Sequence, residues 1–129
     1  MTSAVSFSRR FLIWVYTVSH SELLLRSTKT SDLVTRIDVF FKNVAAIHLP
    51  TILDGLAVSE ATDIERVELH LQIDPSRLEG RKVFVVRGSN FTGYVVAGVM
   101  AWHEDEQEYH EPSYFTLTPI QSIQKGGIG

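Results

Sequence analysis

The densest group of side chains that could do chemistry lies late in the chain, in the run Trp102–Glu111. Imidazole nitrogens and carboxylates are competent zinc or manganese ligands, and this run holds both. On a helix, His103 and His110 would lie two turns apart on one face, with Glu106 three residues after His103. The spacing matches no known signature such as His-Glu-x-x-His. The two histidines are therefore weak metal candidates, and no metal site is predicted.

The same run offers little for catalysis. Paired carboxylates act as acid and base only where a pocket separates their pKa values, and a crowd of acids singles out no pair. The chain has no Gly-x-Ser-x-Gly elbow, no phosphate-cradling glycine loop and no dinucleotide fingerprint. It also has no cysteine, which excludes disulfides, thiolate zinc sites and a cysteine nucleophile. We predict no catalytic residue and no cofactor, and the sequence favours a protein that is not an enzyme.

The charge distribution is the stronger signal. The formal net charge of the chain is −3, yet no Lys or Arg occurs between Gly88 and Gln124, where five acids fall. Concentrated charge of one sign steers association with a partner of the opposite sign, although runs of like charge are also common in solvated loops. We therefore expect an acidic surface that binds a protein partner. Its candidate contact residues are Trp102, Glu104, Asp105, Glu106, Glu108, Tyr109 and Glu111.

Composition also narrows the class of partner and the compartment. A mildly acidic chain argues against nucleic-acid binding, and no apolar run approaches the roughly 18 residues of a membrane span. Ser8-Arg9-Arg10 looks like a twin-arginine export signal. The apolar run after it is short and β-branched, and no small-residue cleavage site follows, so a strand is the better prediction. The expected location is the cytoplasm.

The elements that must position these residues are mostly strands. Apolar residues alternate with polar ones along several short segments separated by turn residues, which is typical of an antiparallel sandwich or barrel. Thr51–Val58 is ambiguous between strand and short helix, and Ser113–Ile120 is weakly strand-like. The clearest strand predictions are Phe11–Val18 and Glu22–Arg26 as a hairpin turning at Ser19–Ser21, then Arg36–Lys42, Val44–Leu49, Val67–Ile73, Lys82–Arg87 and Tyr94–Trp102, the last punctuated by Gly98.

This pattern predicts a single domain over residues 1–129, mainly β, as an antiparallel sandwich or partly open barrel of about seven strands. Few short helices are expected. The alternative is an α+β arrangement with one or two short helices, around Thr51–Val58 or Glu104–Tyr109. A rival function is a small-ligand carrier or enzyme with a pocket inside the sheet. A homo-oligomer is a third alternative. The pocket of the rival would be lined by Trp14, Tyr16, Phe41 and Trp102.

Two stretches carry a resemblance to a known group. They are Trp14-Val15-Tyr16 followed by Ser19–Ser27, and Arg36–Val44 continuing through Ile47, Leu49-Pro50 and Gly55–Val58. Together these stretches resemble small uncharacterised bacterial β-rich proteins, some of which are grouped with the immunity proteins of polymorphic toxin systems. The resemblance rests on apolar spacing over about half of the chain. It implies a protein that binds and blocks a toxin, often through an acidic face.

Overall fold

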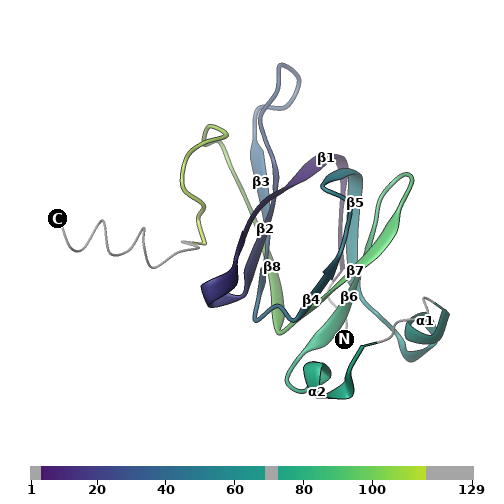
Figure 1. Ribbon diagram of the computed structural model, residues 1–129. Helices are drawn as coiled ribbons and strands as arrows, with labels where there is room; N and C mark the ends of the chain where they lie inside the picture. Colours follow the sequence, from purple (N-terminus) through teal and green to yellow (C-terminus); the bar gives the residue numbers. More distant parts are fainter. Residues whose placement is uncertain (1–3, 69–72, 116–129) are drawn as a thin grey trace.

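The computed structural model describes residues 4–68 and 73–115. In this part of the chain eight antiparallel strands form one open sheet, in the order β4-β7-β6-β5-β1-β2-β3-β8 (Figure 1). The prediction of a mainly β, antiparallel protein with few short helices is confirmed, with eight strands where about seven were expected. The elements are β1 (Ala4–Thr17), the 3₁₀ turn η1 (Val18–His20), β2 (Glu22–Ser27), β3 (Arg36–Lys42), β4 (Ala46–His48), β5 (Ile52–Glu60), α1 (Asp63–Glu68), α2 (Pro75–Leu78), β6 (Lys82–Arg87), β7 (Thr92–Ala97) and β8 (Val99–Asp105).

The sheet bends so that its two halves face each other. Figure 1 shows β2, β3 and β8 on one side and β5, β6 and β7 on the other. Strand β1 belongs to both halves, because its first part pairs with β5 and its last part pairs with β2. The pairing of β1 is irregular between Phe7 and Arg10 and again between Ile13 and Val15. Irregularities of this kind let a strand bend, so one long strand serves both halves.

The main core fills the space between the two halves. Leu23 and Leu25 of β2 lie opposite Phe41 and Val39 of β3, and all four side chains are fully buried there. Phe84 of β6 meets Phe41 from the other half, with ring centroids 5.6 Å apart. The apolar residues that alternate along these strands in the sequence therefore lie on their inner face, toward the core. Truncating such a leucine to alanine costs about 2–5 kcal/mol.

The outer face of β2 and β3 is buried as well. Leu24 and Phe40 lie on this face, where they are almost inaccessible and pack against Val15 and Phe115. The charged Arg26 and Asp38 share the same face and are also buried. The cover is the chain that follows β8, which turns back over the sheet (Figure 1).

One predicted strand is a helix at its start. Val67 and Glu68, which open the predicted strand Val67–Ile73, belong to α1. The N–H of Thr62 donates to Glu65 Oε1 at 2.9 Å, and the N–H of Glu65 donates to Thr62 Oγ1 at 3.1 Å. This reciprocal capping box starts a helix, and it outweighs the alternating pattern that follows. Residues 69–72, and with them the centre of the predicted strand, lie outside the described residues.

Other boundaries differ for local reasons. The predicted strand Tyr94–Trp102 is two strands, because Gly98 separates β7 from β8 where the chain passes between the halves of the sheet. The N–H of Gly98 donates to the carbonyl of Lys42 at 2.9 Å, and a Cβ on Gly98 would lie 3.1 Å from the Asn43 side chain. The short helices of the α+β alternative, at Thr51–Val58 and Glu104–Tyr109, do not form. The first segment falls largely within β5, and the second begins as the end of β8.

Candidate protein-binding surface

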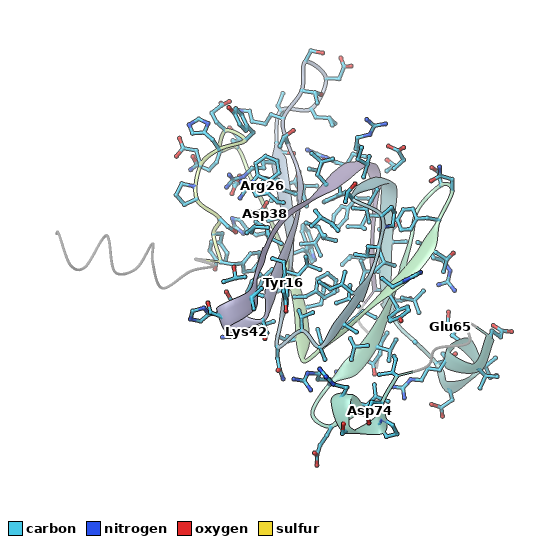
Figure 2. The ribbon with its side chains drawn as sticks, in the orientation of Figure 1. Tyr16, Arg26, Asp38, Lys42, Glu65 and Asp74 are labelled. Carbon is cyan, nitrogen blue, oxygen red and sulfur yellow. The ribbon has the colours of Figure 1, made fainter. Side chains whose placement is uncertain are left out.

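Two arginines are buried on the outer face of the β2–β3–β8 half. Arg26 of β2 lies directly opposite Asp38 of β3, and the side chains are only 2% and 1% exposed (Figure 2). The Arg26 Nε donates to Asp38 Oδ1 at 2.7 Å, and its Nη2 donates to Oδ2 at 3.0 Å. Arg36 of β3 makes the same two-pronged contact with Asp105 of β8, at 3.1 and 3.0 Å. Both guanidinium groups are held rigidly by a facing carboxylate.

The remaining nitrogens of these arginines hold the segment Glu106–Phe115, which we call the strap. Arg26 Nη1 donates to the carbonyl of Tyr109 at 2.8 Å and to that of Glu111 at 3.3 Å. Arg36 donates to the carbonyls of Glu108, Glu111 and Pro112 at 3.0, 2.7 and 3.2 Å. A buried charge must have its donors paired, and the carbonyls of the strap supply the partners. The strap contains no helix or strand, so side chains of the sheet hold its backbone in place.

Aromatic rings fasten the strap at both ends. Near its start the ring of Tyr109 meets Trp14 of β1 edge to face, with centroids 6.4 Å apart, and the Arg26 guanidinium lies 5.1 Å from the Trp14 ring. At its end Phe115 stacks on Phe40, with centroids 4.9 Å apart. Contacts of this kind add to the packing energy of the rings. Trp14, which comes from the irregular part of β1, is therefore part of the strap's support.

The acidic side chains of the predicted surface divide into two groups. Asp105 pairs with Arg36, Glu108 lies 2.8 Å from Lys29 Nζ, and Glu104 accepts a hydrogen bond from the Thr35 hydroxyl at 2.7 Å. Glu106 and Glu111 form no ion pair with a Lys or Arg of the described residues. Negative charge therefore remains in surplus around the strap.

Two of these carboxyls have lowered pKa values. Partial burial by itself raises the pKa of Asp105, but the hydrogen bonds from Arg36 and from the N–H of Gln107 outweigh burial, so the pKa lies below its ordinary value. The hydrogen bond and charge of Lys29 lower the pKa of Glu108. Both groups are thus held in the charged form at neutral pH.

The strap displays aromatic as well as acidic side chains. Tyr109 is 58% exposed and Tyr114 is 66% exposed, although the Tyr114 ring stacks on His103 with centroids 3.9 Å apart. Glu106, at the start of the strap, is exposed as well. Four of the predicted surface residues therefore lie in the strap: Glu106, Glu108, Tyr109 and Glu111. Asp105 ends β8 on the same face of the sheet, whereas Glu104 lies opposite Ile37 of the core and so faces the inner side.

Trp102 does not belong to this group. It lies opposite Val39 of the core, and so it faces the inner side of the sheet, where its ring meets Phe7 edge to face at 5.2 Å. The Trp14 ring lies on the outer side, over Arg26. The two tryptophans cannot line one pocket, and Phe41 is fully buried in the core. The four residues named for an internal pocket do not surround one.

Two small hollows are lined by described residues near the strap. One of about 130 Å³ lies between Trp14, Arg26 and the strap residues His110–Ser113, and one of about 120 Å³ lies between Arg10, Arg26 and the loop that follows β2. Pockets that enclose a small molecule run to about 300 Å³ or more. Arg26 borders both hollows, but four of its five N–H donors are already used in bonds to Asp38 and the strap.

The two metal candidates are used in packing. His103 stacks on Tyr114, and its Nε2 lies 3.9 Å from Asp105. His110 meets the ring of Tyr109, and its Nε2 lies 3.9 Å from Glu111. Over residues 4–68 and 73–115, no group of three His, Cys, Asp or Glu side chains is placed to hold a metal ion.

The comparisons add no relative. The chain matches no protein-family model, no curated protein and no solved structure. No helix of the described residues is long and apolar enough to cross a membrane.

Sequence reasoning missed the residues that hold the strap. Arg26, Arg36 and Asp38 stand at the ends or in the middle of apolar strands, and their spacing alone resembles the exposed face of a half-buried strand. The one available signal was the apolar outward face, because Leu24 and Phe40 predict a cover over that side of the sheet. Which segment supplies the cover could not be inferred from sequence.

Proposed function

We propose that this chain is a protein-binding domain, and that the strap together with Trp14 is the surface to which a basic protein binds. One observation carries the proposal. Two buried arginines fix the backbone of an exposed segment that is rich in tyrosine and glutamate. The rings of Tyr109 and Tyr114 contact Trp14 and His103, but a segment whose only role was to cover the sheet would not need to leave both tyrosines more than half exposed.

The fixed backbone favours binding because it lowers the entropy lost on association. Ordering a flexible loop costs about 0.5–1.5 kcal/mol for each immobilised side chain, and that cost opposes binding. Here Arg26 and Arg36 already order the strap through five hydrogen bonds to its carbonyls. Loops held by a rigid scaffold are common binding elements for this reason.

The side chains indicate what kind of partner fits. Tyrosine and tryptophan are enriched where protein interfaces carry most of their binding energy, and Tyr109, Tyr114 and Trp14 supply them here. The carboxylates of Glu106 and Glu111 attract a surface rich in Lys and Arg. If the resemblance to immunity proteins extends to function, the basic partner is a toxin domain whose active surface the strap covers.

Charge reversal tests the proposal. The double variant Glu106→Lys/Glu111→Lys should associate with the partner about tenfold more slowly at low salt, and the difference should shrink as ionic strength rises. The matched control is Glu68→Lys/Glu79→Lys, which changes the net charge equally at two exposed positions, at the end of α1 and just after α2, far from the strap (Figure 1). The partner is first captured from a lysate and identified by mass spectrometry, and association rates are then measured with both proteins purified.

A second variant separates anchoring from steering. Tyr109→Ala should speed dissociation of the same complex at least about tenfold without changing the salt dependence of association. If the partner binds the Glu106→Lys/Glu111→Lys and Tyr109→Ala variants as well as it binds the control, the strap is not the binding surface and the proposal fails.

A further inference from the structure

Among the residues that the structure describes, strand β8 is paired along one edge only. All seven of its residues pair with β3 in an unbroken register, from Val99 opposite Lys42 to Asp105 opposite Arg36. The strand is last in the sheet order, and no other described backbone group bonds to its second side. A long, regular edge offers a row of unpaired N–H and C=O groups to another strand. The other edge strand, β4, is only three residues long.

The side chains along this edge protect only part of it. Natural edge strands are kept from pairing by charges, prolines or bulges. In β8 the charged and titratable residues all lie at the end, in His103–Asp105, whereas the half Val99–Trp102 has none. Val99 is 50% exposed and Trp102 is 45% exposed. Almost half of the Trp102 side chain is therefore accessible, at the middle of a strand whose second edge has no partner among the described residues.

We propose that two copies of this chain form a dimer by antiparallel pairing of their β8 strands, with the twofold axis at Trp102. A symmetric antiparallel pair has one residue opposite its own copy. Trp102 is the central residue of Val99–Asp105, so an axis there uses all seven residues of both strands. Each half-exposed indole then packs beside its copy at the centre of the interface, where binding energy concentrates.

The charged side chains favour a second copy of the chain as the partner of β8, and they favour the register that is centred on Trp102. With Trp102 on the axis, Asp105 lies opposite Val99 of the second copy, and Glu104 lies opposite Met100 of that copy. No carboxylate therefore faces another across the interface. Within one chain Val99 lies opposite Lys42. In the dimer Val99 would therefore lie between Lys42 of its own chain and Asp105 of the second copy, with all three side chains on the same face of the sheet. Moving the axis by one residue loses two pairs, and moving it to Glu104 sets two carboxylates opposite each other.

Two substitutions of opposite charge at Val99 test the proposal. Val99→Asp would face Asp105 of the second copy twice in the symmetric dimer, so the dissociation constant should rise roughly fivefold or more. Val99→Lys should leave the dimer as tight as wild type or tighter. Within one chain the effects run the other way, because residue 99 lies opposite Lys42. Sedimentation equilibrium measures the dimer, and thermal unfolding of each variant at low concentration reports on the fold of the single chain.

The two tryptophans of the chain provide a matched pair. Trp102→Ala should weaken the dimer at least about 30-fold, whereas Trp14→Ala, at the strap, should leave it unchanged. The proposal is overturned if the wild-type protein stays monomeric at millimolar concentration. It also fails if a dimer forms that Trp102→Ala and Val99→Asp both leave intact, because the contact then lies elsewhere. The dimer is independent of the strap's proposed role, since its test needs no partner protein.

Discussion

The buried pair of Arg26 and Asp38 gives the sharpest prediction for the stability of this protein. Arg26→Met keeps an unbranched apolar side chain but removes every guanidinium contact. Asp38 then remains buried without its bidentate partner, and the carbonyls of Tyr109 and Glu111 lose the Arg26 donors. The variant should therefore have a lower free energy of unfolding than the wild type, and the strap near Tyr109 should no longer be held to the sheet by residue 26.

The magnitude follows from the burial of the pair. Breaking a fully buried ion pair by removing one member costs about 3–5 kcal/mol, because the remaining charge is desolvated and uncompensated. A domain of this size loses about 4 °C of melting temperature for each kcal/mol. Arg26→Met should thus melt about 12–20 °C below the wild type. A domain of ordinary stability, about 5–15 kcal/mol, still folds at low temperature after such a loss.

The double variant Arg26→Met/Asp38→Leu separates the two effects. It removes the buried charge along with its partner, and replacing both members of a buried pair by apolar residues is often neutral or stabilising. The double variant should recover most of the melting temperature. It should not recover the strap, because a methionine side chain in place of Arg26 has no donor for the carbonyls, so amide exchange near Tyr109 should stay fast.

Thermal unfolding followed by circular dichroism measures these differences. The control is Arg10→Met, which breaks the exposed pair of Arg10 with Asp54 and should leave the melting temperature unchanged. An Arg26→Met variant that melts within about 4 °C of the wild type would contradict this prediction, since the pair would then contribute no more than a surface contact. So would a double variant that is less stable than the single one.

Two further predictions concern pH and a close contact. Because Arg36 holds the pKa of Asp105 below its ordinary value, the pair stabilises the fold above the pKa of a free aspartate, about 3.9, and loses that effect as the pH falls through the lowered value. The stability gap between wild type and Asp105→Asn, measured by urea unfolding, should be constant above about pH 5 and narrow below about pH 4; a gap that persists to strong acid would contradict this. A Cβ on Gly88 would lie 2.0 Å from the Phe91 ring, so Gly88→Ala should cost about 1–3 kcal/mol, and adding Phe91→Leu should restore part of it. Equal melting temperatures for wild type and Gly88→Ala would show that the ring moves freely.

Much of the fold could be predicted from local patterns. The hairpin turning at Ser19–Ser21 and the strands Arg36–Lys42 and Lys82–Arg87 are confirmed, because apolar alternation and turn residues act over a few neighbouring positions. The same pattern failed at Val67, where the capping box just before it competed with the alternation and won. Gly98 indicated an interruption in the predicted strand. The sequence did not show that the chain passes there from one half of the sheet to the other.

The candidate site shows where local patterns stop. Composition and alternation are enough to predict a mainly β chain with an excess of acid late in its length, because neither depends on distant contacts. They could not show that Arg26 and Arg36 hold the strap, or that Trp102 lies on the edge strand of the described sheet and not with the strap. Arg26 and Tyr109 are 83 positions apart, and their contact depends on the register of the strands and the path of the chain after β8. Such a contact forms because the buried guanidinium groups need hydrogen-bond acceptors, and the fold brings the carbonyls of the strap within reach.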